Sequence, residues 1–356
     1  QLSNREGGEI LGGQELTLTA DRIDNQNSRI ASENWLQVIA RGLRNSQQAV
    51  ISAYRSLGLE TDELENLGDS AIYSEQAELN VLAGRLRNSE SLIQAHENIN
   101  IQTAGLTNQA GRILTDTGDI EIRVAGAGVL ANSGTIAAGK DLKLDAEQLT
   151  NESALLLSGQ NMQLSVGQLH NQHADIYSVG DIRIQGRAEG AEATRLDNLS
   201  ATIEAGQDLH IFAKEVENKR TVLETLEGKY FASIKELPCG SPYPVGDCKL
   251  GSNGRRNAVW QLTERDKLEV VESTAAAEIM AGRDLTIEAD TLGNHSSRLS
   301  AGRDINFELG QLNNIGISPY NIELTRVFVS GRKPDYYYYA GLASSFNATH
   351  ANKVQP

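Results

Sequence analysis

Carboxylates that recur at intervals are the first residues in this chain whose type and spacing could do chemistry. A column of them could bind calcium, since Ca²⁺ prefers oxygen ligands. Each copy offers only one carboxylate, however, and the Gly-Gly-x-Gly-x-Asp sequence of calcium-binding rolls is absent. A turn aspartate that hydrogen-bonds to nearby backbone explains every copy, so we predict no metal site and no catalytic carboxylate pair. These aspartates follow a glycine by one or two positions, at Asp119, Asp141, Asp181, Asp208, Asp284 and Asp304.

Histidine and cysteine give weaker signals. His170 and His173 resemble half of a metal site, but no third ligand is evident, and exposed turn histidines are the better interpretation. Cys239 and Cys248 fit a disulfide, with unpaired thiols or half of a metal site as alternatives, although no second cysteine pair or nearby histidine completes a zinc site. No nucleophile elbow or protease signature is present. We therefore predict a chain that is not an enzyme and needs no cofactor.

The elements that position these residues follow from a repeat of about twenty residues. Each copy opens with Ile or Leu and closes with Asn fifteen positions later, and the clearest copy runs from Ile136 to Asn151. We predict that the closing amides stack as a structural ladder along one corner of the fold. The predicted ladder contains Asn25, Asn45, Asn66, Asn108, Asn151, Asn171, Asn218, Asn294 and Asn314.

Apolar and polar residues alternate within each copy, as at Leu142 and Leu144, which is the period of a strand. Glycine and aspartate between the strands favour turns. About twenty residues that wind once and return roughly 4.8 Å along an axis form one coil of a parallel β-helix. We therefore predict an all-β fold: a right-handed parallel β-helix of about twelve coils, although the repeat alone does not fix the hand, with one large hairpin-like insertion.

The repeat also predicts the organisation of the chain. We assign residues 1–218 to coils, 219–278 to a non-repeat insertion, 279–314 to the final coils and 315–356 to a tyrosine-rich segment that begins a following region. The formal net charge of −15 and the dispersed basic residues argue against nucleic-acid binding. No apolar stretch is long enough to span a membrane, and the first residues form neither a signal peptide nor a natural start. We expect a monomeric segment of a longer protein.

Aromatic residues concentrate outside the repeat. Strand-like runs at residues 221–236 and 258–271 predict a long hairpin closed by the disulfide near its tip. For the tail after residue 314 we favour a β-segment that packs on the last coil, with an exposed docking surface as the alternative. A partner-binding surface, if the chain has one, is expected at Tyr230, Phe231, Tyr243, Trp260, Tyr336, Tyr337, Tyr338 and Tyr339.

The repeat Ile-x-Ala-Gly-(Arg/Lys/Gln)-Asp-Leu-x-Leu-x-Ala-x-x-Leu-x-Asn, over roughly residues 10–314, resembles that of the filamentous haemagglutinin family of Gram-negative two-partner secretion. The insertion after Asn218-Lys-Arg and the return through residues 273–285 resemble the contact-dependent growth-inhibition effectors. The resemblance implies export through an outer-membrane two-partner secretion pore and display on the outer-membrane surface. It also implies a filament that carries a toxin toward an outer-membrane receptor on a neighbouring bacterium.

Two other classes of function compete with this hypothesis. One is a host-directed adhesin of the haemagglutinin type, and the other is a polysaccharide lyase or hydrolase, since such enzymes also use parallel β-helices. An adhesin would bind host cells and ignore bacteria. An enzyme would release cleaved sugars from acidic polysaccharides. The sequence does not identify a receptor or a toxin.

Overall fold

The computed structural model describes residues 1–237, 259–329 and 336–350. The chain forms two compact units, the first made of Gln1–Thr221 and Ala275–Gly316 and the second of Val222–Thr274 with the residues from Ile317 onward. The structure therefore joins the insertion and the segment after the final coils, which the sequence analysis treats as separate regions, into one unit.

The first unit is a parallel β-solenoid, which confirms the predicted fold class, but it has about fourteen turns instead of twelve. One coil that the repeat search misses opens at Ile72 and closes at Asn88, sixteen positions later. The extra residue lies in the turn that follows Ala71–Ser74, and the strands on both sides stay in parallel register with those of the neighbouring coils. A turn can therefore absorb a residue without disturbing the stack.

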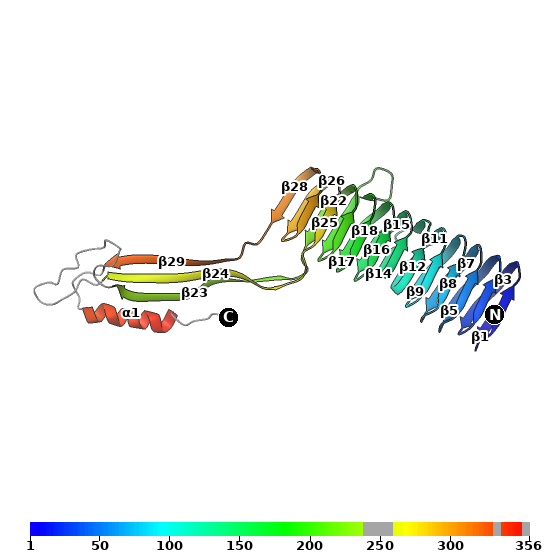
Figure 1. Cartoon of the computed structure of the whole chain (residues 1–356), viewed down its shortest axis with the longest axis horizontal. Coiled ribbons are helices and arrows are strands. Elements are labelled where there is room, and N and C mark those ends of the chain that lie inside the picture. Colours follow the sequence, from blue (N-terminus) through cyan, green and yellow to red (C-terminus); the bar gives the residue numbers. More distant parts are fainter. Residues whose placement is uncertain (238–258, 330–335, 351–356) are drawn as a thin grey trace, which may run out of the picture. The chain divides into compact units, whose positions relative to one another are not determined.

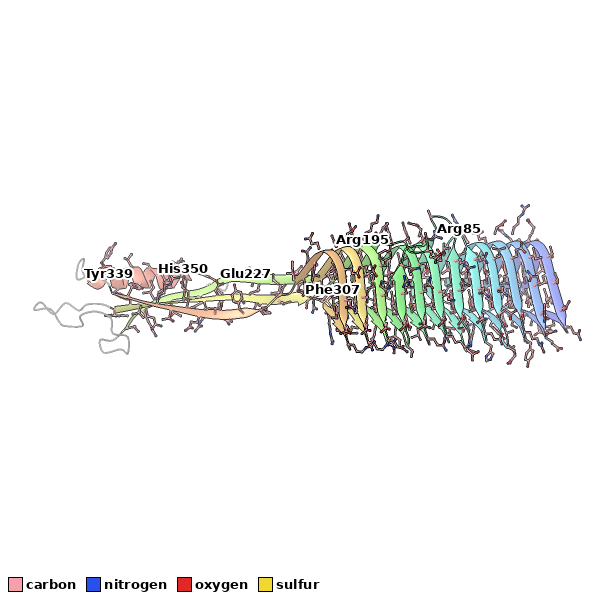
Figure 2. All side chains as sticks on the ribbon, turned by 90° about the horizontal axis from the view of Figure 1, so that it is seen from above. Arg85, Arg195, Glu227, Phe307, Tyr339 and His350 are labelled. Atoms are coloured by element: carbon pink, nitrogen blue, oxygen red, sulfur yellow. The ribbon has the colours of Figure 1, made fainter. Side chains whose placement is uncertain are left out.

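Each typical coil contains a strand of four residues and a longer strand of eleven or twelve (Figure 1). The long strand bends once. In β3 (Glu15–Gln26) and β5 (Trp35–Ser46) the pairing continues through Ala20 and Ala40, skips one residue, and resumes at Arg22 and Gly42. Each coil thus has three straight stretches, and long polar side chains such as Arg85 and Arg195 project from its outside (Figure 2).

The short strands are β2 (Glu9–Gly12), β4 (Arg29–Ser32), β6 (Val50–Ala53), β8 (Ala71–Ser74), β10 (Leu92–Ala95), β16 (Leu155–Ser158), β18 (Asp175–Ser178), β21 (Thr202–Ala205), β25 (Glu278–Ala281) and β27 (Arg298–Ala301). The other long strands are β7 (Leu57–Leu67), β9 (Leu79–Ser89), β15 (Leu142–Glu152), β17 (Met162–Gln172), β22 (Leu209–Lys219), β26 (Leu285–His295) and β28 (Ile305–Ile315). The remaining solenoid strands are β1 (Leu2–Arg5), β11 (Ile99–Thr103), β12 (Leu106–Thr115), β13 (Ile120–Val124), β14 (Val129–Ala138), β19 (Ile182–Gln185) and β20 (Ala193–Leu199).

The core is a column of aliphatic side chains, one set from each coil. The residues that open the repeats pair with one another from coil to coil, and they are fully buried except in the end coils, where Ile10 and Leu299 are partly buried. Burying each such side chain completely contributes roughly 1.5–3 kcal/mol. Their stacking explains how a chain with only 5% aromatic residues can have a core. This column includes Ile30, Ile51, Ile72, Ile93, Ile113, Ile136, Leu156, Ile176, Ile203 and Ile279.

Asparagines line one corner of the solenoid. In each step the side-chain Nδ2 of one asparagine donates to the Oδ1 of the asparagine in the next coil, at 2.8–2.9 Å. The column contains the nine asparagines named from the sequence together with Asn4, Asn88, Asn132 and Asn198. The turn that follows is tight: two positions after the asparagine, residues such as Asn27, Glu90 and Ser296 have positive φ.

The second unit is an antiparallel three-stranded sheet with one helix. Its strands β23 (Leu223–Leu237) and β24 (Val259–Ser273) form the hairpin, and β29 (Tyr320–Val329) pairs with the other edge of β24. The prediction that the segment after residue 314 packs on the last coil is wrong, because the hydrogen-bonding partner of β29 is β24. Residues Tyr336–His350 form helix α1. Cys239 and Cys248 lie outside the described residues, so their disulfide stays a prediction.

Candidate partner-binding surface

A β-bulge decides which side chains share a face of the three-stranded sheet. The register between β23 and β24 shifts between Lys229 and Phe231, so Tyr230 has no partner across the ladder. Successive residues of a regular strand point to opposite faces, and a bulge re-aims one of them. The side chains of Tyr230 and Phe231, although adjacent in sequence, therefore both lie on the face of the sheet that carries Arg265 and Lys267. A regular strand would place them on opposite faces.

The face that carries these two rings also carries positive charge. The Lys267 ammonium lies 5.4 Å from the centroid of the Tyr230 ring, and the Arg265 guanidinium lies 4.9 Å from that of Phe231. Both distances are typical of cation–π contacts. The Tyr230 hydroxyl donates to Asn321 Oδ1 at 2.9 Å, and Arg265 Nε donates to Glu323 Oε2 at 2.8 Å. We name Tyr230, Phe231, Arg265, Lys267, Asn321 and Glu323 the bulge face.

The opposite face of the sheet is covered by α1 at one end. Trp260 is 4% exposed and packs with Ala343 of the helix, so it supports the sheet from its interior and offers almost no surface to a partner. The helix also protects the edge of β23: Asn347 Oδ1 accepts from the Ile234 N–H at 2.6 Å, and its Nδ2 donates to the Ile234 carbonyl at 2.7 Å. A side-chain amide thus replaces a neighbouring strand at this edge.

The other aromatic residues predicted from the sequence divide between exposed and undescribed positions. Tyr338 of α1 is 55% exposed and meets Tyr339 edge-on, with ring centroids 5.6 Å apart. Tyr243 and the side chains of Tyr336 and Tyr337 lie outside the described residues. The structure therefore brings Tyr230 and Phe231 together, and places Trp260 and Tyr339 at the covered side of the sheet.

Among the described residues of this unit, two ionisable groups have shifted pKa values. A hydrogen bond from the Lys229 ammonium, at 2.7 Å, lowers the pKa of Glu264 against the opposing effect of desolvation, and the Lys229 and Arg326 charges add to the decrease. The Tyr320 hydroxyl donates to Glu227 Oε1 at 3.0 Å, and this bond, with desolvation and the Glu227 charge, raises the pKa of Tyr320. Both interactions link different strands, so they favour this sheet register.

The recurrent aspartates of the solenoid hold the backbone of the following coil. The Asp208 Oδ1 accepts from the Asp284 N–H at 3.1 Å, and the Arg283 guanidinium donates to the same carboxylate at 2.7 and 3.1 Å. Burial alone would raise the pKa of Asp208, but these hydrogen bonds and the Arg283 and Arg303 charges together lower it. Among the residues that the structure describes, no three His, Cys, Asp or Glu side chains are grouped to hold a metal ion.

The same backbone-bonding geometry recurs at Asp119, Asp141 and Asp181, with Asn161 interrupting the run of charges. His170 contacts Gln172 at 3.0 Å and lies 3.9 Å from Asp197. Within the described ranges, no helix is both long and apolar enough to cross a membrane.

The chain combines a stacked solenoid and its asparagine ladder with a separate three-stranded sheet, and it belongs to the haemagglutinin-repeat family. This family matches residues 1–81, 66–152, 115–211 and 250–318. The chain is 25% identical over 373 residues to the "tRNA nuclease CdiA" of Escherichia coli strain STEC_O31, an alignment that covers 97% of this chain and 11% of that protein. It is also 25% identical over 191 residues to "Toxin CdiA" of Escherichia coli, covering 51% of this chain and 6% of that protein.

The chain is thus a CdiA-like haemagglutinin-repeat protein segment that spans about a tenth of the length of the first of these relatives. No solved structure matches it significantly. The repeat solenoid is a structural segment of a filament, and the nuclease activity in the relative's name is a property of that protein.

Proposed function

We propose that this chain is part of the surface filament of a two-partner-secreted, contact-dependent growth-inhibition protein. In this proposal the solenoid is the shaft, the longer protein leaves the cell through an outer-membrane pore, and the bulge face contacts an outer-membrane receptor on a neighbouring bacterium. Alignment with one CdiA protein over nearly the whole chain supports the shaft role.

The physics of the solenoid suits a shaft. The strands of each coil hydrogen-bond to those of the neighbouring coils, so the coils can fold progressively as the chain leaves a pore. About fourteen turns, at roughly 4.8 Å each, give this solenoid a length on the order of 65 Å. A β-column keeps that reach, whereas a flexible linker of the same sequence length would coil.

The observation that supports a binding role is the bulge, which places Tyr230 and Phe231 on the same face as Arg265 and Lys267. Aromatic and arginine side chains dominate the energetics of protein interfaces. The bulge interrupts a regular ladder to place two rings together, and the opposite face is the one that packs against α1.

Binding of the labelled chain to intact Gram-negative cells tests this proposal. We expect the double variant Tyr230→Ala/Phe231→Ala to lose binding by tenfold or more, because two interface aromatics are removed. The matched control, Tyr54→Ala/Tyr177→Ala, removes two tyrosines from the outside of the solenoid and should bind like the wild type. Equal binding by both variants would refute the role of the bulge face, and binding to host cells alone would favour a host adhesin.

A further inference from the structure

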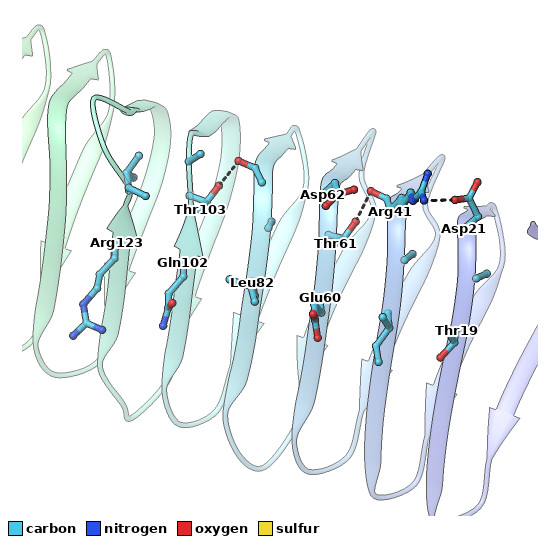
Figure 3. Close-up of a pocket in the computed structure, with 18 of the residues that line it drawn as sticks. Thr19, Asp21, Arg41, Glu60, Thr61, Asp62, Leu82, Gln102, Thr103 and Arg123 are labelled. Atoms are coloured by element: carbon cyan, nitrogen blue, oxygen red, sulfur yellow. Dashed lines mark hydrogen bonds and ion pairs between the residues drawn. The ribbon is translucent and has the colours of Figure 1, made fainter.

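A groove runs along one corner of the solenoid, over successive coils (Figure 3). Its volume is about 940 Å³, and it lies where the long strands bend. At this corner the inward-facing side chains are small: Ala20, Ala40, Thr61, Ala83 and Thr103. The groove exists because no large side chain fills the bend.

The two threonines do not offer their hydroxyls to a ligand, since these are bonded to the backbone. Thr61 Oγ1 donates to the Arg41 carbonyl at 3.0 Å, and Thr103 Oγ1 contacts the Gly84 carbonyl at 3.3 Å (Figure 3). Gly84 and Ala104 at the bend itself add almost no bulk. Ligand contacts must therefore come from the outward-facing row beside the bend and from Asp62, which lies at the bend itself.

That row presents one exposed side chain from each coil, and its members pair in register along the axis. Ile39 is 38% exposed and Leu82 is 52% exposed, and the side chains between and beyond them are polar. Successive members are separated by one coil step, roughly 4.8 Å. The row consists of Thr19, Ile39, Glu60, Leu82, Gln102 and Arg123.

The groove carries both positive and negative side chains, and the polar side chains at its centre have no hydrogen-bond or ion-pair partner among the described residues. Arg41 pairs with Asp21 at 3.3 Å, and Arg123 pairs with Glu121. The side chains of Glu60, Asp62 and Gln102 make no hydrogen bond or ion pair within the part of the chain that the structure describes. Balanced charge disfavours a nucleic acid or another polyanion, which needs clustered cations.

An arginine closes one end of the groove. Arg187 follows β19, and its side chain reaches back to earlier coils, where Nε donates to Asp145 Oδ1 at 2.6 Å and Nη2 donates to the Val124 carbonyl at 2.9 Å. A third bond goes to the Gly126 carbonyl. Three of the five N–H groups of the guanidinium thus hold the loop, and the side chain limits how far a ligand can extend along the row.

We propose that this groove binds a neutral oligosaccharide chain that runs parallel to the solenoid axis. Glu60, Asp62 and Gln102 would hydrogen-bond to its hydroxyl groups, and Ile39 and Leu82 would contact the C–H faces of its rings. An extended peptide fits less well, because strand addition needs a free sheet edge, and β5, β7, β9 and β11, which line most of the groove, are already paired on both sides. Among the described pairings of the groove strands, only the Glu15–Ala20 stretch of β3 has a single partner strand. The coil step gives a linear polymer repeated contacts at regular intervals.

The test titrates the purified chain with three neutral hexasaccharides: cellohexaose, maltohexaose and the β-1,4-linked hexamer of N-acetylglucosamine. A galacturonate hexamer is the acidic comparison, and binding is measured by calorimetry and saturation-transfer NMR. We expect at least one neutral hexasaccharide to bind. The variant Glu60→Ala/Gln102→Ala should bind it tenfold or more weakly, because hydrogen bonds to a charged group and an amide are lost. The control variant Glu63→Ala/Gln168→Ala removes the same side-chain types beyond the bend.

The proposal holds if the control variant binds like the wild type and both variants keep the wild-type circular dichroism spectrum. Three results overturn it: no neutral hexasaccharide binds at millimolar concentration, the Glu60→Ala/Gln102→Ala variant binds as well as the wild type, or only the acidic hexamer binds. Because the groove and the bulge face belong to different units, failure here leaves the proposed receptor contact untouched.

Discussion

Replacing Asn108 with alanine tests how much the asparagine ladder stabilises the solenoid. Asn108 is fully buried, and its Nδ2 donates to Asn132 Oδ1 at 2.8 Å, to the Gly111 carbonyl at 3.1 Å and to the Thr135 carbonyl at 3.2 Å. Its Oδ1 accepts from Asn88 Nδ2 at 2.8 Å. The variant takes one hydrogen-bond partner from Asn88 Nδ2 on one side and one from Asn132 Oδ1 on the other, where the Gly134 N–H at 3.3 Å remains as a donor.

The expected loss of stability follows from those lost hydrogen bonds. A buried donor or acceptor without a partner costs about 1–3 kcal/mol. Asn88 Nδ2 keeps its bonds to the Ser91 and Arg112 carbonyls, so the free-energy cost at this atom lies at the low end of that range. We therefore expect Asn108→Ala to destabilise its coils by about 3 kcal/mol in total.

Hydrogen exchange of the amides in β12 and β14 is the suitable assay, because coils of a solenoid can open locally. A loss of about 3 kcal/mol should accelerate exchange there by roughly two orders of magnitude. The control Asn80→Ala removes an exposed asparagine and should change stability by less than about 0.5 kcal/mol. Protection within fivefold of the wild type in Asn108→Ala would refute the view that the ladder stabilises the coil.

Three further predictions follow from the geometry. Because folding lowers the pKa of Asp208, the ionised carboxylate stabilises the fold at pH values above the ordinary carboxyl pKa, and this stability is lost as the pH falls through the folded-state pKa. In acid unfolding, wild type should therefore be more stable than Asp208→Asn above the ordinary carboxyl pKa, and the two should be equally stable below the folded-state pKa. Trp260→Ala should cost about 3–5 kcal/mol in the second unit and release α1, measured as faster amide exchange in Tyr336–His350, whereas Trp35→Ala, at a residue 55% exposed, should leave α1 unchanged. Arg187→Ala should increase proteolysis between residues 186 and 192 with no change in β5 or β7 exchange, and equal cleavage of wild type and variant would contradict the role of its three bonds.

The sequence contains most of the information that defines the solenoid, because one requirement repeats in every coil. An aliphatic residue must fill the column and an amide must continue the ladder, so residues equivalent to Ile136 and Asn151 recur in each coil. The pattern fails at Asn88, where a turn takes an extra residue at no cost to pairing. Spacing alone misses this coil, although the Leu79–Val81 alternation and Asn88 together would have identified it.

The second unit is less predictable because each of its contacts occurs once. The hairpin of β23 and β24 is visible as two strand-like runs, but the bulge at Tyr230 depends on a register that only the assembled sheet defines. The pairing of β29 with β24 joins residues separated by two coils. Helix α1 begins in a tyrosine run whose residue type favours strands, so its tertiary contact with Trp260 overrides local preference.

The order of the strands along the chain couples the last coils to the second sheet. β24 precedes those coils and β29 follows them, so pairing the two strands closes a loop of residues 269–319. Closing a flexible loop of that length costs on the order of 3 kcal/mol, and folded coils lower this cost because they already restrict the loop. The hairpin of β23 and β24 closes without them.

A core substitution in these coils should therefore loosen β29 and spare the hairpin. Leu292→Ala removes a fully buried side chain from β26 and should destabilise the final coils by about 2–5 kcal/mol. We expect faster amide exchange in β29 and little change in the amides that pair β23 with β24, while Leu64→Ala, in a distant coil, should affect neither. If the β29 amides stay protected from exchange in Leu292→Ala, then the pairing of β24 with β29 offsets the free energy of loop closure without help from the final coils. In that case the final coils do not control how the sheet is completed.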